Sequence, residues 1–307
     1  MRQPYPSYKD SGSHWLGSVP SHWSVVRADA VLVSNMAQVQ PDSFRDRDVF
    51  HYSIPVVQES GIGHVESGEN IQSSKLLVTE PQVLVSKLNP RKGTTCIAVP
   101  HELTTVCSGE FIPLVPREVD LHFTFYFVSS ASYRQRLEAR VESATRSHQR
   151  VAPSDIIKFK WALPPLDEQQ TITAFLDRET GKIDALVEEQ RRLIALLKEK
   201  RQAVISHAVT KGLDPDAPLK PSGIDWLGDI PEHWTVNKFA RCVRIAEGQI
   251  DPRGEPYSAM MLIAPNHIET GTGRLVARET AADQGAMSGK YIFEAGAVIY
   301  SKIRPAL

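Results

Sequence analysis

The sequence predicts an α+β protein, in which a mixed α/β domain precedes a long coiled-coil spacer helix and a partial second copy of the same domain. Three observations support this prediction. The 307 residues are 41% hydrophobic, which is enough for more than one packed core. A segment of fifteen residues recurs 211 positions further along the chain. Between the two copies, residues 167–209 repeat their apolar side chains with a helical period.

The repeat indicates a duplicated domain. Residues 11–25 read SGSHWLGSVPSHWSV and residues 222–236 read SGIDWLGDIPEHWTV, with nine of fifteen positions identical. Further similarities pair residues 59–63 with 269–273 and residues 85–90 with 300–305. A period this long is too large for a solenoid and indicates a domain plus a connector. Measured against the first copy, the second is incomplete, and we expect a truncated second domain.

We expect four segments: a first domain at 1–165, a spacer helix at 166–212, a linker at 213–225 and an incomplete second domain at 226–307. In the first domain, the apolar runs at 82–86 and 110–115 predict strands, and residues 122–140 have helical spacing. The repeated tryptophans are expected to be scaffold residues, since a tryptophan is usually a core anchor. They are Trp15, Trp23, Trp226 and Trp234.

The spacer helix is the clearest single element. It follows Pro164 and Pro165, and it ends near Gly212 before a segment rich in proline. Residues 167–209 would extend over roughly 64 Å, which is too long for an ordinary core helix. Every seventh residue forms an apolar seam that requires a partner helix. The residues expected to contact a protein partner are Ile183, Leu186, Gln190, Leu193 and Leu197.

The charge balance indicates that any binding of nucleic acid would depend on local clusters of basic residues and not on the net charge of the chain. The chain has 35 basic and 36 acidic residues, so any DNA-binding groups must be gathered in particular places. Residues 87–92 carry three positive charges on a turn, and residues 145–150 form a dense set of hydrogen-bond donors. Each could instead be an ordinary solvated loop, and Lys75 is a weaker third candidate. The candidate DNA-binding residues are Lys75, Lys87, Asn89, Arg91, Lys92, Arg146, Ser147, His148, Gln149 and Arg150.

Several motifs that would indicate catalysis are missing from the sequence. It has no phosphate-binding loop of the G-x-x-x-x-G-K-[ST] type, no glycine-rich loop for S-adenosylmethionine, and no Asn/Asp-Pro-Pro-aromatic motif. The three cysteines have no C-x-x-C spacing, and no His/Cys cluster has ligand spacing. We therefore expect no enzymatic activity, no metal and no cofactor. A polar N-terminus and the lack of an 18-residue apolar stretch favour a cytoplasmic protein without a membrane partner.

Three motifs together resemble the specificity subunits of type I restriction-modification systems. They are the two W-L-G-x-[V/I]-P-x-H-W segments beginning at Trp15 and Trp226, the segment SKLNPRKG at 86–93, and LPPLDEQQ at 163–170, which opens the long helix. The resemblance implies two target-recognition domains separated by two long antiparallel helices. Each domain would recognise one half of a split double-stranded DNA target. The helices would hold the methyltransferase subunits and, through them, the motor and nuclease subunit. This chain departs from the pattern in lacking the second half of its second copy and the second helix.

Three alternatives remain open at this stage. The chain could be a nuclease, which metal-dependent cleavage by the isolated chain would reveal. It could be a non-catalytic scaffold, which predicts no salt-sensitive DNA binding. It could also be a truncated specificity subunit that forms a homodimer through its one long helix and recognises a palindromic site.

Overall fold

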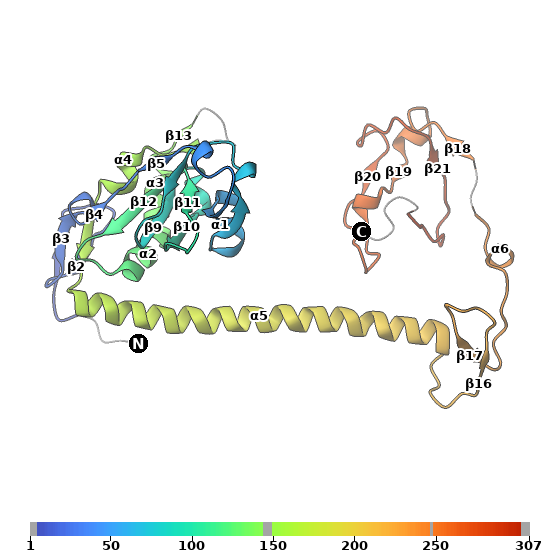
Figure 1. Ribbon diagram of the computed structural model, residues 1–307. Coiled ribbons are helices and arrows are strands. Elements are labelled where there is room, and N and C mark those ends of the chain that lie inside the picture. The colour runs from blue at the N-terminus through green and yellow to red at the C-terminus, as the bar shows by residue number, and fades with distance from the viewer. Residues whose placement is uncertain (1–4, 144–148, 246–247, 302–307) are drawn as a thin grey trace. The chain divides into compact units, whose positions relative to one another are not determined.

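The computed structural model describes residues 5–143, 149–245 and 248–301, and the chain divides into two compact units, 1–195 and 196–307. Figure 1 shows the first unit as a sheet-rich domain with helices α2, α3 and α4. The helices are α1 Ile54–Ser60, α2 Leu121–Ser129, α3 Ala131–Glu138, α4 Pro153–Ile157, α5 Leu166–Lys211 and α6 Phe239–Cys242.

The first unit contains two larger sheets. The four-stranded sheet has the order β10-β9-β12-β4, and the five-stranded sheet has the order β5-β8-β11-β6-β7. Only β11 and β6 run parallel within these two sheets. The strands are β1 Tyr8–Asp10, β2 Ser18–Pro20, β3 Ser24–Arg27, β4 Leu32–Val33, β5 Gln38–Val39, β6 Asp48–Tyr52, β7 His64–Ser67, β8 Lys75–Leu77, β9 Gln82–Ser86, β10 Thr95–Ala98, β11 Thr105–Ser108, β12 Phe111–Pro116, β13 Glu142–Ser143, β14 Gln149–Arg150 and β15 Lys160–Leu163.

Strand β9 is buried on both faces. Val83 and Val85 point into the core shared with the helices, whereas Leu84 between them points into the core between the two sheets. Successive side chains of a strand lie on opposite faces, so a strand covered on both sides needs an unbroken apolar run. This confirms the strands predicted at 82–86 and near 110–115, because β12 has the same arrangement.

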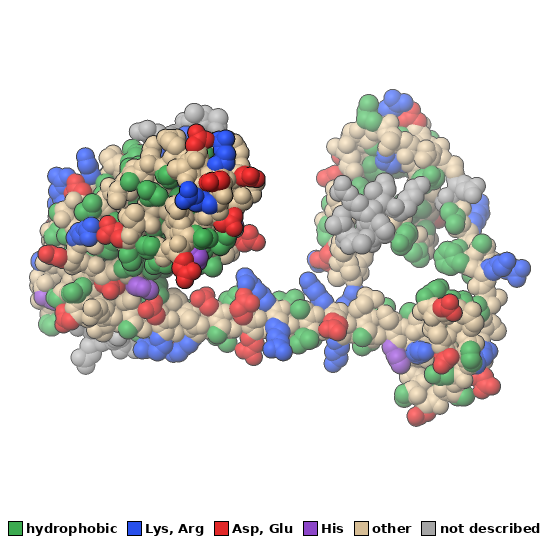
Figure 2. Space-filling view, in the orientation of Figure 1, with side chains coloured by type: hydrophobic (Ala, Val, Ile, Leu, Met, Phe, Trp, Pro, Cys, Tyr) green, Lys and Arg blue, Asp and Glu red, His purple; other side chains and the backbone are tan. Residues whose placement is uncertain are grey.

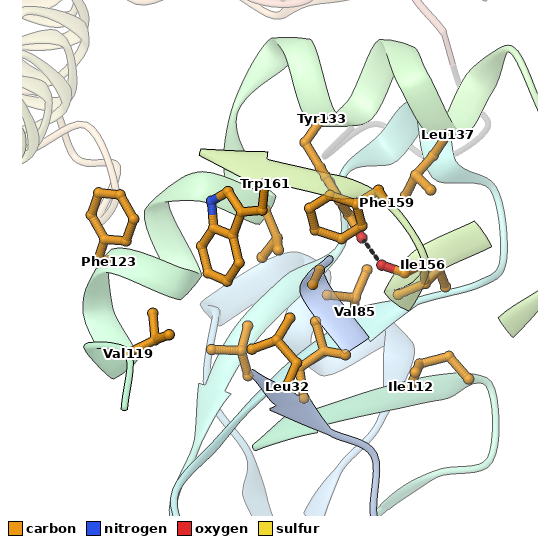
Figure 3. Packing of buried hydrophobic residues seen from close by; sticks show 14 of the residues in the cluster. Leu32, Val85, Ile112, Val119, Phe123, Tyr133, Leu137, Ile156, Phe159 and Trp161 are labelled. Carbon is orange, nitrogen blue, oxygen red and sulfur yellow. Dashed lines mark hydrogen bonds between the residues drawn. The ribbon is translucent and has the colours of Figure 1, made fainter. Parts of the chain in front are cut away.

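Aromatic side chains fill the core on the helical side of the four-stranded sheet. Trp161, from β15, is fully buried beside Phe127 and Phe159. Figure 3 shows the Tyr133 hydroxyl donating to the Ile156 carbonyl oxygen within this core, at 2.6 Å. That bond satisfies a buried polar group whose isolation would cost about 1–3 kcal/mol.

The helix predicted over residues 122–140 is two helices. Ser130 has an extended backbone, with φ −66° and ψ 149°, and its side chain accepts a hydrogen bond from the Tyr133 amide. Serine competes for backbone hydrogen bonds and is a strong N-cap, so a new helix begins there. The apolar periodicity continues across the break, and for that reason the pattern alone did not reveal it.

The predicted long helix is confirmed as α5. Glu168 and Gln169, both within the LPPLDEQQ motif, bind its first turns to the first unit. Gln169 is buried, accepts from the Asp120 amide at 2.9 Å and donates to the Pro164 carbonyl at 2.9 Å. The Glu168 carboxylate lies 2.8 Å from His22 Nε2 and accepts from Trp23 Nε1 at 3.3 Å.

The pKa of Glu168 is lowered as a result of these contacts. Burial alone would raise it, but hydrogen bonds from Tyr5, His22 and Trp23 outweigh that effect. The motif therefore has a structural explanation, because two of its residues fix the origin of the helix.

The second unit repeats backbone pairings of the first. Its strands are β16 Leu219–Pro221, β17 Asp229–Pro231, β18 Gln249–Ile250, β19 Met261–Leu262, β20 Glu279–Thr280 and β21 Lys290–Tyr291. The pair β16–β17 has the register of β1–β2 displaced by 211 residues. The pair β18–β21 matches β5–β8, and Lys290 binds Ser288 as Lys75 binds Ser73.

The tryptophans differ between the two units. Trp15 packs against the rings of Phe127 and Phe159, which confirms its scaffold role. Trp226 is 82% exposed, so the same prediction was wrong for that residue, whereas Trp234 is half-buried. The partners of Trp15 come from segments more than a hundred residues further along the chain, and the described part of the second unit contains no counterpart to them.

Gly68 provides a test of the packing in the first unit. A Cβ atom at Gly68 would lie 1.9 Å from the Phe44 carbonyl oxygen and 2.9 Å from that of Arg47. Because both contacts are backbone atoms, Gly68→Ala should lower the free energy of unfolding by about 3 kcal/mol or more. Gly109→Ala is the matched control, since nothing lies within 4 Å of its Cβ position. Urea denaturation of both variants measures the difference, and equal stabilities would contradict this packing.

Candidate nucleic-acid interface

The structure brings the two predicted DNA-binding segments together. Leu88 and Arg150 form an isolated antiparallel bridge. The Asn89 amide donates to the Gln149 carbonyl at 2.7 Å, and the Val151 amide donates to the Lys87 carbonyl at 3.0 Å. Residues 87–92 and 149–150 are therefore one surface, although about sixty positions separate them in the sequence.

The segment 87–92 is a tight turn that follows strand β9. Asn89 adopts a left-handed conformation with φ 49°, and residues 90–92 form a single 3-10 turn that closes at Gly93 with φ 59°. Asparagine and glycine are the residues that tolerate this backbone region most readily. The turn leaves Arg91 and Lys92 exposed, with Lys92 Nζ donating to the Gln58 side chain at 3.2 Å.

The second segment is only partly described. Arg146, Ser147 and His148 lie outside the described residues, so their predicted role stays a prediction. Gln149 is half-buried, and Arg150 projects a side chain that is 57% exposed.

The structure argues against Lys75 as a DNA contact. The residue is 8% exposed, and its ammonium group donates to the Ser73 side chain at 2.7 Å and to the Ser73 carbonyl at 3.1 Å. Burial lowers the pKa of Lys75, although Glu66 opposes this effect. A buried lysine that already has partners cannot neutralise a phosphate at the surface without leaving its site.

Two residues of this surface were missed in the sequence. Arg134 of α3 lies beside the turn, and its side chain would be 3.5 Å from a Cβ atom at Gly93. Glu110 forms an ion pair with Arg150 at 2.9 Å and lies 4.0 Å from Lys87. No signal for this ion pair was present in the sequence, because a single acid at a strand end is usually just solvated.

Helix α5 presents a second candidate surface. In Figure 2, charged side chains of both signs alternate with apolar ones along its length. Beyond the contacts of Tyr126 with Asp177 and Thr180, the predicted seam is open to solvent, and Leu186 is 58% exposed. The other predicted partner residues, Ile183, Gln190, Leu193 and Leu197, are also exposed.

Metal-binding clusters and reactive thiols can be assessed among the described residues. Within residues 5–143, 149–245 and 248–301, no group of three or more His, Cys, Asp or Glu side chains is placed to hold a metal ion. Burial raises the pKa of the Cys96 and Cys107 thiols to about 12, which leaves them protonated and unreactive at neutral pH. None of the described helices combines the length and the apolar character needed to cross a bilayer.

Sequence comparison confirms the resemblance drawn from the motifs. No family model matches the chain. The chain is 30% identical over 172 residues to the specificity subunit of the type I restriction enzyme EcoDI of Escherichia coli, a match that covers 51% of this chain and 38% of that protein. The chain therefore spans well under half of this relative.

Solved structures from type I restriction-modification systems also match part of the chain. The HsdS subunit from Thermoanaerobacter tengcongensis is 19% identical with a TM-score of 0.47, covering 66% of this chain and 53% of that one. The type I S subunit from M. genitalium is 16% identical with a TM-score of 0.38, covering 66% and 52%. A third structure, of a type I R-M system and described as explaining complex assembly and conformational transition, is 20% identical with a TM-score of 0.49. That match covers 66% of this chain and 53% of that one.

The paired segments predict a salt-dependent effect on DNA binding. Replacing Arg146 and Arg150 together with Ala should weaken binding and reduce the slope of log K against log salt by about 2, because two phosphate contacts are lost. If either arginine contacts a guanine, discrimination at one position should fall by about 1–3 kcal/mol as well. Fluorescence anisotropy on the full chain, alone and with modification subunits, measures both quantities.

The control for this experiment replaces Arg27 and Arg117, which are paired with Asp29 and Glu80 elsewhere in the same unit. The control removes the same charge from a different place. An affinity and a salt slope unchanged from wild type in the Arg146/Arg150 variant would show that this surface does not contact DNA.

Proposed function

We propose that this chain is a DNA-recognition subunit of a type I restriction-modification complex. Its first unit would recognise one half of a bipartite target, and α5 would dock the methyltransferase subunits. The observation that carries the proposal is the joining of residues 87–92 to 149–150 into one surface, on which Arg91, Lys92 and Arg150 are exposed. The sequence similarity to a specificity subunit supports it independently.

The chemistry of that surface suits a DNA duplex. Arg91 and Arg150 offer planar groups that bind phosphate or guanine through two hydrogen bonds, while Lys87 and Lys92 supply point charges. Asn89 carries a side-chain amide, a group that can pair with adenine; its Oδ1 atom is buried here and would have to turn outward to do so. Turns at strand ends are held by a rigid core yet remain free to enter a groove, which is the usual arrangement for recognition residues.

In this proposal the chain itself is non-catalytic. It would direct the methyltransferase subunits, and through them the motor and nuclease subunit, to a particular sequence. Purified chain incubated with duplex DNA, S-adenosylmethionine, ATP and Mg²⁺ should neither methylate nor cut it. Incorporation of labelled methyl groups or cleavage by the isolated chain would contradict this part of the proposal.

The exposed seam of α5 favours a second function, namely homodimerisation to recognise a palindromic site. Soluble monomers rarely tolerate a long continuous apolar stripe. Gln190 interrupts the stripe, and a polar residue at a seam position tends to fix the register and the number of strands. We therefore expect a defined dimer when the methyltransferase subunits are absent.

Sedimentation velocity tests this expectation. Replacing Leu186 and Leu193 with Lys should abolish self-association and leave the first unit folded, because both side chains are exposed and lie outside the described core. Ala195→Lys with Gln202→Lys is the control, since it adds the same charge on the opposite side of the helix. A wild-type chain that stays monomeric and soluble at tens of micromolar would refute the dimer.

A further inference from the structure

Glu110 is an acid at the centre of a surface that otherwise suits DNA. It occupies the turn between β11 and β12, where its amide donates to the Ser108 hydroxyl at 3.3 Å. A carboxylate here repels phosphate, so its presence weakens the attraction that the neighbouring cations provide. A residue that opposes binding yet makes several contacts invites a structural explanation for its position.

Glu110 contacts both DNA-binding segments. Through its backbone, the carbonyl accepts from the Lys87 amide at 2.9 Å. Through its side chain, Oε1 accepts from Arg150 Nη2 at 2.9 Å, and Oε2 lies 4.0 Å from Lys87 Nζ. Glu110, in the turn directly before β12, thus links residues 87–92 to β14. This link is additional to the direct pairing of Leu88 with Arg150.

The two carboxylate oxygens have different surroundings. The Glu110 side chain is 30% exposed, but Oε2 is buried and has no hydrogen-bond partner among the described residues. Lys87 Nζ, at 4.0 Å from Oε2, is beyond hydrogen-bonding distance. A buried acceptor without a donor is costly, so the carboxylate is oriented by the Arg150 contact and not by optimal solvation.

The ion pair restricts an arginine that would otherwise move freely. The Arg150 side chain is 57% exposed, and an unrestrained arginine loses considerable rotamer freedom when it binds a ligand. A carboxylate that holds the guanidinium in one orientation lowers that cost for a DNA base or phosphate in the matching place. It also penalises sequences that require another orientation.

We propose that Glu110 is a positioning residue that orients Arg150 and Lys87 and so sets which DNA sequence is preferred. The inference rests on the proposed function, because it assigns a role within DNA recognition. Glu110 does not touch the base that is recognised; it acts through the two cations. Loss of the Glu110 carboxylate should therefore reduce the preference for one DNA sequence without reducing the affinity for random duplex.

The test is Glu110→Gln in the full chain, which keeps the size and an acceptor oxygen but removes the charge. The probe is a duplex library with randomised positions, selected on wild type and variant and sequenced. The preference of Glu110→Gln for the wild-type site over random duplex should fall about tenfold or more. Affinity for random duplex should stay level or rise, with a salt slope steeper by at most about 1. A general folding defect would instead lower binding to all sequences equally.

Glu102→Gln is the matched control, because Glu102 is an exposed acid of the same unit and its loss changes the net charge equally. Hydrogen exchange supplies a readout that does not need DNA. The amides of Asn89 and Val151, which join the two segments, should exchange faster than in wild type in Glu110→Gln. In Glu102→Gln they should exchange at the wild-type rate.

The outcomes separate the two proposals. If wild type selects no sequence, alone or with modification subunits, the proposed function fails, and with it this inference. If wild type selects a site and Glu110→Gln selects it with equal preference, only the role of Glu110 is overturned. Unchanged exchange at Asn89 and Val151 would likewise show that Glu110 does not hold the two segments in place.

Discussion

The first unit depends on the pairing of its two ends. Strand β3, just after the first tryptophan-containing segment, pairs along its length with β15, the last strand before α5. Trp161 lies within β15 and fills the aromatic core, so the same strand that closes the sheet also anchors the helices. Gln169 then fixes the first turns of α5 to Asp120 and Pro164. The strand pairing that closes the domain therefore lies only a few residues before the contacts that fix the start of α5.

This closure explains why a rigid framework carries the candidate DNA-binding turn. Strand β9 is buried on both faces and ends at Ser86, and residues 87–92 continue directly from it. Gln149 and Arg150 pair with this turn, and the chain then continues directly into α4 and β15. The candidate interface is thus held by two elements of the same core, and its side chains are presented from positions that the core determines.

The sequence predicted features that depend on regular periodicity or repetition. The long helix, the strands at 82–86 and 111–116 and the repeated strand pairings of the two units all leave such patterns. What it could not predict depends on contacts between distant residues: the burial of Lys75, the pairing of Glu110 with Arg150, and the exposure of Trp226. The break at Ser130 was missed for a different reason, because a cap interrupts the backbone without interrupting the apolar pattern. The two candidate DNA-binding segments were identified separately, but their contact could be seen only in the fold.

The fixed origin of α5 gives the helix a defined rotational phase. Glu168, Gln169, Thr173 and Asp177 all bind the first unit, so the start of the helix cannot turn about its own axis. Each residue of an α-helix advances the direction of its side chain by about 100°. Inserting or deleting one residue beyond the anchored turns would swing the entire apolar stripe far around the axis, whereas three or four would return it close to its original direction. The anchored turns thus fix the direction in which the side chains further along α5 point. Insertions or deletions in this helix therefore preserve the direction of its apolar stripe only when they amount to about one whole turn.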